Sequence, residues 1–327
     1  METNYIYSVS KVKVLEQSLP RLSDYERLLS TDNEDSFLLA IKETGLNFDY
    51  SQIKKRSELL PALENIIISA KNLLQKISPE KTPLQILWLS HDIHNLRLMA
   101  RAIRTDLEWE DIKKLTSEAG IYDPRYVWQK VQAKRLDDLF FAQVQNVFKR
   151  AEDIGLDKLD ELFDSLYFDI GQSFIEKTKD RFLKNYWLSF VNLHNLIGHL
   201  RWLENKSVNF SLKLITKTGV LRVDKLNSSE EVLQEFIKFG GENFWREAIE
   251  YYQTGRGTTK INIKMREYCL WLAKKQASDM FSSASLVLYY LKCLQAIDNL
   301  RMITIGKNSG MDLSEIKSNL QTMYVSK

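Results

Sequence analysis

Residues 86–104 read ILWLSHDIHNLRLMARAIR, and two later segments of the chain repeat this pattern. The second copy is YWLSFVNLHNLIGHLRWLE at residues 186–204, and the third is YLKCLQAIDNLRMITIGK at residues 290–307. The three copies align on Asn95, Asn195 and Asn299. One copy therefore occurs about every hundred residues, which indicates an internal repeat rather than a short-period solenoid.

Apolar residues recur in the first copy at steps of three and four, which predicts an α-helix with one buried stripe. Asparagine is a mediocre helix former, so its presence at three equivalent mid-helix positions indicates a shared role. We interpret that role as a buried hydrogen bond between the amide and a neighbouring backbone. A direct functional contact is the alternative.

A second feature follows the same period. Glu64, Glu161 and Glu267 each lie on an apolar helical stretch about thirty residues before the aligned asparagine. The chain has 12 Gly and 5 Pro in 327 residues, which favours helices over the turn-rich pattern of an all-β protein. The sequence therefore predicts an all-α fold of three homologous helical domains, at residues 1–105, 106–206 and 207–327. Extended structure is expected, if anywhere, at 210–215 and 219–223.

Helix ends can also be predicted. Asn33 and Ser228 have the character of helix N-caps, and Asp312 begins a capping sequence after Gly310, which is expected to end the third repeated helix. The helical stretch 51–78 contains Pro61, where a break is expected. Residues 254–259 (TGRGTT) are expected to form a flexible loop.

Charge and cysteine content exclude several classes of protein. The chain has 46 basic and 43 acidic residues, so no strong positive field marks it as a nucleic-acid binder. No apolar run approaches the length of a membrane span, and residues 1–20 do not resemble a signal peptide. Cys269 and Cys293 lie on apolar helical stretches, which indicates reduced core thiols and a reducing compartment.

Reactive constellations are not evident. His91 and His94 share a helix face but lack a third metal ligand, and packed or surface histidines are the favoured interpretation. Gly306-Lys307 is not preceded by the glycine and strand of a phosphate loop. We therefore expect no catalytic residues, no cofactor, no metal and no small-molecule substrate.

The end of the chain resembles a known family. Asn299-Leu300-Arg301, Gly306-Lys307, Gly310 and Glu315-Ile316 are similar to the closing pattern of the C subunits of archaeal- and bacterial-type V-ATPases, called d subunits in eukaryotes. The segment Asp92–Leu96 resembles a helix of the family's first domain. Tyr5–Leu19 resembles its opening helix, although Lys11 and Lys13 stand where the family tends to have two arginines. The positive charge is kept there, but the bidentate geometry of arginine is not.

The resemblance implies a fold and a role. Members consist of three similar helical domains arranged as a funnel. The funnel sits on the membrane proteolipid ring and receives the central shaft of the ATPase. The chain would then be a cytoplasmic, peripheral rotor protein that passes torque for proton or sodium transport without catalytic residues of its own.

Five arginines on the repeated helices are candidates for partner contacts, and they lie off the buried stripes: Arg97, Arg101, Arg104, Arg201 and Arg301. For each of them, a solvated position or an ion pair within one domain is the alternative. We hypothesise that charge reversal at Arg97 and Arg101 weakens shaft binding while the isolated protein stays folded.

Two other classes of protein compete with this interpretation. The first is a helical scaffold or adaptor unrelated to ATPases, although a period near a hundred residues is unusual for repeat scaffolds. The second is a helical enzyme, which would need a metal or a pocket with perturbed carboxylates.

Overall fold

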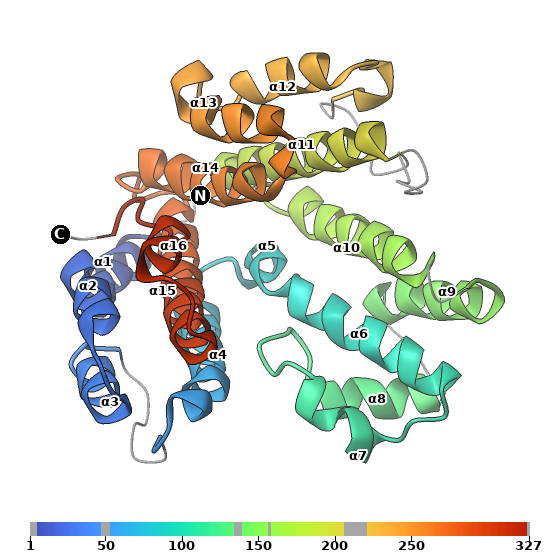
Figure 1. Ribbon diagram of the computed structural model, residues 1–327. Coiled ribbons are helices and arrows are strands. Elements are labelled where there is room, and N and C mark those ends of the chain that lie inside the picture. Colours follow the sequence, from blue (N-terminus) through green and yellow to red (C-terminus); the bar gives the residue numbers. More distant parts are fainter. Residues whose placement is uncertain (1–4, 47–52, 134–138, 156–157, 206–220, 326–327) are drawn as a thin grey trace. The chain divides into compact units, whose positions relative to one another are not determined.

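The computed structural model describes residues 5–46, 53–133, 139–155, 158–205 and 221–325 (Figure 1). Across these ranges every regular element is helical, and no strand occurs in them. The predicted all-α class is therefore confirmed. The segment 210–215, which was a candidate for extended structure, lies outside the described residues. Val223, at the end of the second candidate, begins the short 3₁₀ helix η5 (Val223–Lys225).

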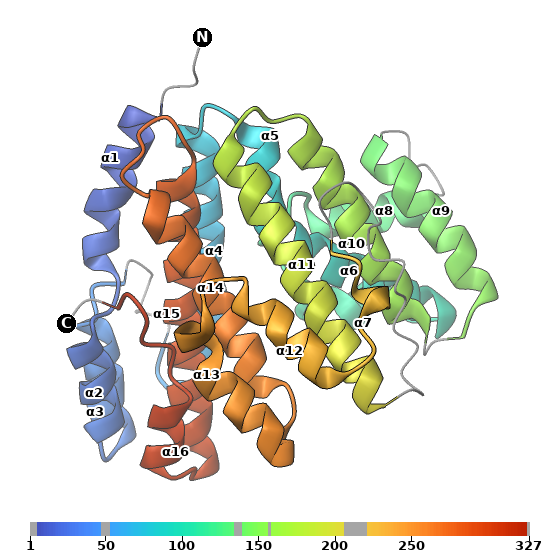
Figure 2. The same ribbon diagram turned by 90° about the horizontal axis from the view of Figure 1, so that it is seen from above.

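The chain divides into two compact units, Met1–Pro79 with Cys269–Lys327 and Glu80–Tyr268. In the first unit the long helix α15 packs against α1, α2, α4 and α16, so the two ends of the chain share one core (Figures 1 and 2). The unit contains α1 (Ile6–Leu15), η1 (Glu16–Ser18), α2 (Leu22–Ser30), α3 (Glu34–Lys42), α4 (Arg56–Ile77), α15 (Ala284–Ser309) and α16 (Leu313–Ser318). Helix α14 (Thr259–Gln276) runs from the second unit into the first.

In the second unit α6 packs against α8, α9 and α10, while α11 packs against α10 and α12. Its helices up to α9 are α5 (Lys81–Leu84), η2 (Gln85–Leu87), α6 (Leu89–Arg104), α7 (Trp109–Ile112), η3 (Lys113–Leu115), α8 (Pro124–Gln132) and α9 (Leu139–Asp153). The remainder are α10 (Leu159–Glu176), α11 (Arg181–Glu204), η5, α12 (Ser229–Ile237), α13 (Glu242–Tyr251), the π-helical turn η6 (Tyr252–Arg256) and α14.

Most helix ends follow the local chemistry predicted from the sequence. The Asn33 side chain accepts the Ser36 N–H, the Ser228 hydroxyl accepts the Glu231 N–H, and the Asp312 carboxylate accepts the Ser314 N–H. Gly310 ends α15 in the left-handed conformation at φ 69°, where a side chain would be strained.

One local expectation was wrong. Helix α4 continues through Pro61, which lies in its second turn. The missing proline N–H there costs only one hydrogen bond close to the helix start, and the apolar side that follows is buried in the core at Leu63, Ile66 and Ile67. At 254–259 the backbone leaves helical geometry at Gly255 (φ 77°), within η6 (Tyr252–Arg256), and at Gly257 (φ 72°), before α14 begins at Thr259. The flexibility expected of this segment stays a prediction.

Two of the three aligned asparagines, Asn95 and Asn299, form the buried backbone bonds expected of them. Asn95 Nδ2 donates to the Ser117 carbonyl at 2.8 Å, and the Ser117 N–H donates back to Asn95 Oδ1 at 2.8 Å. Asn299 makes the same two bonds to Gln321, each at 2.8 Å. In both cases the partner lies 22 residues further along the chain. We call this two-way bond the amide clamp.

A second polar position lies one turn earlier in the first two repeated helices. Asp92 accepts the N–H groups of Ile121 and Tyr122 at 2.6 and 3.1 Å, and Asn192 accepts the N–H of Leu221 at 2.9 Å. Gly120 allows this approach, since a Cβ there would lie 2.8 Å from Asp92 Oδ1. Helix α6 thus shares the amide clamp with α15 and this second polar contact with α11.

The clamps also bear on how the chain is divided. Asn195 is 2% exposed, but the residue 22 positions after it falls in 206–220, outside the described residues. The bonds of Asn95 and Asn192 reach forward to Ser117 and Leu221, so each repeated helix is tied to the segment that follows it. The division at residues 105 and 206 stays a prediction.

The clamp predicts a large loss of stability for Asn299→Ala. Asn299 is 1% exposed, and its removal leaves a buried N–H and a buried carbonyl of Gln321 without partners. We expect the free energy of unfolding to fall by about 2–4 kcal/mol, measured by urea denaturation. Asn308→Ala, on the exposed side of the same helix, is the control and should change it by at most about 0.5 kcal/mol. Equal losses would show that the clamp contributes nothing specific.

Candidate partner interface

Two of the five candidate arginines form an ion-pair cluster between α6 and α10. Arg97 Nε lies 3.2 Å from Asp160 Oδ1, and its Nη2 lies 2.7 Å from Asp164 Oδ1. Arg101 Nη2 contacts both oxygens of Asp160, at 2.9 and 3.0 Å. The arginines are one helical turn apart and so are the aspartates, so the two rows face each other along the helix pair.

The cluster is only partly shielded from water. The side chains of Arg97 and Arg101 are 27% and 48% exposed, and those of both aspartates are 52% exposed. Pairs of this exposure contribute about 0.2–1 kcal/mol each. Arg97 and Arg101 are therefore ion-paired within the second unit, with partners that lie beyond the domain division predicted at residue 105.

Arg104 and Arg201 are also engaged within the second unit. Arg104 Nη1 donates to the carbonyls of Ala151 and Ile154, at 3.3 and 2.6 Å, where α9 ends. A cation at this position satisfies carbonyls that lack helical partners and favours the negative end of the helix dipole. Arg201 Nε donates to Thr258 Oγ1 at 3.1 Å, just before α14.

Arg301 differs from the other four arginines. It is exposed on α15, and within the described part of the chain its guanidinium has no hydrogen-bond or ion-pair partner. Arg301 and Ile305 occupy the positions on α15 that Arg97 and Arg101 occupy on α6, counted from the aligned asparagine. Ile305 is 52% exposed. The third repeated helix thus presents an unengaged cation beside an exposed apolar side chain.

The residues considered for chemistry have structural roles. His91 Nδ1 lies 2.9 Å from the Ser117 hydroxyl, and His94 Nε2 lies 3.0 Å from the Leu115 carbonyl. Within the described residues, no group of three His, Cys, Asp or Glu side chains could hold a metal ion. Cys269 and Cys293 are buried, as predicted, and burial raises the pKa of the Cys293 thiol to about 12. A thiol of that pKa is a poor nucleophile at neutral pH.

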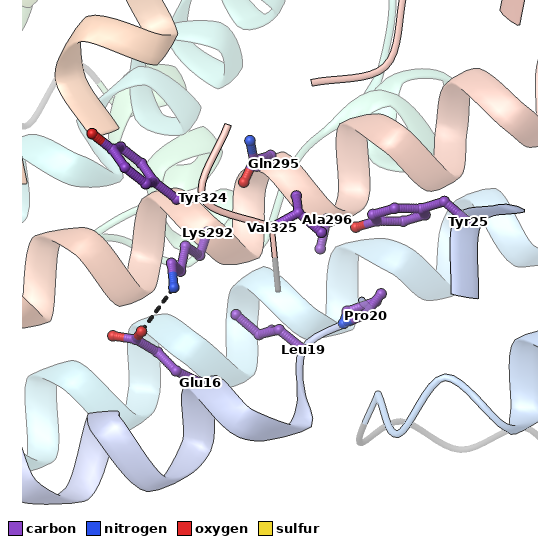
Figure 3. Close-up of a pocket in the computed structure, with 9 residues that line it drawn as sticks. All are labelled: Glu16, Leu19, Pro20, Tyr25, Lys292, Gln295, Ala296, Tyr324 and Val325. Atoms are coloured by element: carbon purple, nitrogen blue, oxygen red, sulfur yellow. Dashed lines mark hydrogen bonds and ion pairs between the residues drawn. The ribbon is translucent and has the colours of Figure 1, made fainter. Parts of the chain in front are cut away.

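One small hollow lies between α1, α15 and the end of the chain in the first unit (Figure 3). Its volume of about 20 Å³ has room for a water-sized group. Glu16 and Lys292 form an ion pair at 2.9 Å along its edge, and Tyr324 covers it from the end of the chain. The hollow is too small for a nucleotide or a metabolite.

The repeated helices with their polar contacts lie along the whole sequence. The segments that resemble the family's opening and closing motifs lie near its two ends. A comparison with protein families matches residues 8–319 to the family described as ATP synthase (C/AC39) subunit. The chain belongs to this family. The resemblance to the C and d subunits of V-ATPases is therefore confirmed, and the chain is part of a rotary ATPase of the V type. No curated protein matches it. Among the described residues, no helix combines the length and apolarity needed to cross a bilayer.

The α6–α10 ion pairs predict that reversing the charge of the two arginines lowers stability modestly, and that reversing the two aspartates as well restores it. Arg97→Glu with Arg101→Glu replaces the attractions to Asp160 and Asp164 by repulsion, and we expect the free energy of unfolding to fall by about 1–3 kcal/mol. Adding Asp160→Lys and Asp164→Lys should restore most of that loss. Urea denaturation of the isolated protein measures the stability of both variants. A quadruple variant no more stable than the double variant would contradict a direct pairing.

Proposed function

We propose that the chain is a non-catalytic central-stalk component of a V-type ATPase or ATP synthase, located at the cytoplasmic side of the membrane. In this role it forms a socket that links the central shaft to the proteolipid ring and transmits torque for ion transport. The observation that carries the proposal is the family match over residues 8–319. A scaffold unrelated to ATPases would not give such a match over almost the whole chain.

The side-chain chemistry supports the absence of a catalytic role. Among the described residues, Asn95 and Asn299 bind backbone groups, and His91, His94 and His199 contact hydroxyl or backbone groups of the chain itself. A protein that transmits force needs stiff helices and specific surfaces rather than reactive groups. The direct test is co-purification of the tagged chain with the shaft proteins and the proteolipid ring. Recovery of the chain alone from a membrane extract that contains the intact complex would contradict the proposal.

Among the five arginines, Arg301 is the one we propose for the shaft contact. A guanidinium that is already paired loses an intramolecular partner when it binds elsewhere, whereas Arg301 has no such partner among the described residues. Arginine is also enriched at the energetic centres of protein interfaces, and the exposed Ile305 supplies apolar area beside it. Arg97 and Arg101 remain second candidates, because about half of the Arg101 side chain is still accessible.

The assignment predicts that Arg301→Glu weakens binding of the shaft proteins by about tenfold or more, equivalent to roughly 1.4 kcal/mol. The isolated variant should keep its stability, since no intramolecular ion pair of Arg301 is lost. Affinity is measured by pull-down or interferometry with the purified shaft proteins. Lys42→Glu, an exposed charge reversal on α3 of the same unit, serves as the control. Equal affinities of the Arg301 variant and the wild type would remove Arg301 from the interface.

A further inference from the structure

Large apolar side chains are exposed along α1 and in the loop before α15. Tyr7 is 69% exposed, Val14 65% and Phe281 55%. The two segments are adjacent, because the Tyr5 N–H donates to the Met280 carbonyl at 3.0 Å. Figure 2 shows the start of α1 beside the loop that joins α14 to α15. All of these residues lie within the first unit.

Helix geometry places the apolar residues of α1 between two lysines. At 3.6 residues per turn, Tyr7 and Val14 fall on the same side of the helix. Lys11 lies at one edge of this side and Lys13 at the other, and both are exposed. The opposite side of α1 is buried through Val9 and Val12. The outer side therefore has an apolar and aromatic centre with an ammonium group at each edge.

Acidic groups near this surface are turned away from it or occupied. No carboxylate lies on the exposed side of α1 within Ile6–Leu15. Glu16, on the side that faces α15, is paired with Lys292 (Figure 3). Asp279 accepts the Phe281 N–H at 2.8 Å and so closes the turn of its own loop. Lys11 and Lys13 outnumber the exposed carboxylate of Asp279, so the net charge of the surface is positive.

We propose that this surface, formed by Tyr7, Lys11, Lys13, Val14 and Phe281, binds the headgroup region of an anionic lipid membrane. Aromatic and aliphatic side chains enter the boundary between headgroups and acyl chains, while flanking lysines extend toward the phosphates. Each lysine near an anionic surface strengthens binding about fivefold. The inference rests on the proposed function in one respect, which is that a component of the V-type ATPase lies next to a membrane.

The chemistry of the cations favours lipid over a protein partner. Lysine carries a compact charge on a flexible stem, which suits headgroups that have no fixed positions. Protein interfaces are centred instead on tryptophan, tyrosine and arginine in fitted pockets. The α1 surface has one such residue, Tyr7, which is 69% exposed on the outer side of a short helix, and neither arginine nor tryptophan lies on that helix.

The test is sedimentation of the full chain with two kinds of lipid vesicle. One kind is phosphatidylcholine alone, and in the other roughly one lipid in three is phosphatidylglycerol. The chain should bind the anionic vesicles, and the binding should weaken as salt rises. Lys11→Glu with Val14→Ser should lower the partition coefficient by about tenfold or more. Circular dichroism establishes that the variant is folded.

A matched control is available on α3 of the same unit. Leu39 and Lys42 have the same three-residue spacing as Lys11 and Val14, and Leu39 is 60% exposed. Leu39→Ser with Lys42→Glu should bind anionic vesicles as the wild type does. No vesicle binding by the wild type, or equal loss in both variants, would overturn the inference.

The outcomes also separate this inference from the proposed function. A Lys11→Glu/Val14→Ser variant that binds vesicles normally but no longer assembles with the ring would assign the surface to a protein and overturn the lipid contact. Normal assembly without any vesicle binding would overturn the lipid contact alone. Vesicle binding in a chain that never joins the ATPase would overturn the proposed function alone.

Discussion

The amide clamp is the constraint around which the repeated helices are built. A primary amide offers one donor group and one acceptor, so Asn95 and Asn299 each satisfy both backbone groups of a single residue. A carboxylate can only accept, and Asp92 accordingly takes the N–H groups of two successive residues. These bonds hold the segment after a helix against its buried side. Such a segment would otherwise carry unpaired backbone groups into the core.

Because the clamps fix one side of α6 and one side of α15, the other sides of these two helices are free to differ, and the differences are informative. On α6 the outer positions hold arginines that face the acidic start of α10. On α15 the same positions hold Arg301 and Ile305, both exposed. Repeated architecture with unequal surfaces suits a part that must contact different partners, and it explains why five similar arginines are not equivalent candidates.

The sequence predicts what depends on local chemistry. The helical period, the caps at Asn33 and Ser228 and the role of the aligned asparagines follow from residue type and spacing. The 22-residue register of the clamp could not be predicted, since its partners Ser117 and Gln321 contribute only backbone. The pairing of Arg97 with Asp164 is equally hidden, because a chain with 43 acidic residues offers too many equivalent partners.

Within the first unit, packed helices connect the exposed Arg301 and Ile305 on α15 with the exposed surface of α1. The Glu16–Lys292 pair joins the end of α1 to α15, and its side chains are only 16% and 13% exposed, so they are less screened than the pairs on α6. Near its other end α15 is held again, where Lys307 Nζ donates to the Thr31 carbonyl at 2.6 Å. The helix between these points is a continuous run with a buried core side. Packed helices, and not a loop, therefore connect Arg301 with α1, which is the continuity that the proposed transmission of torque requires.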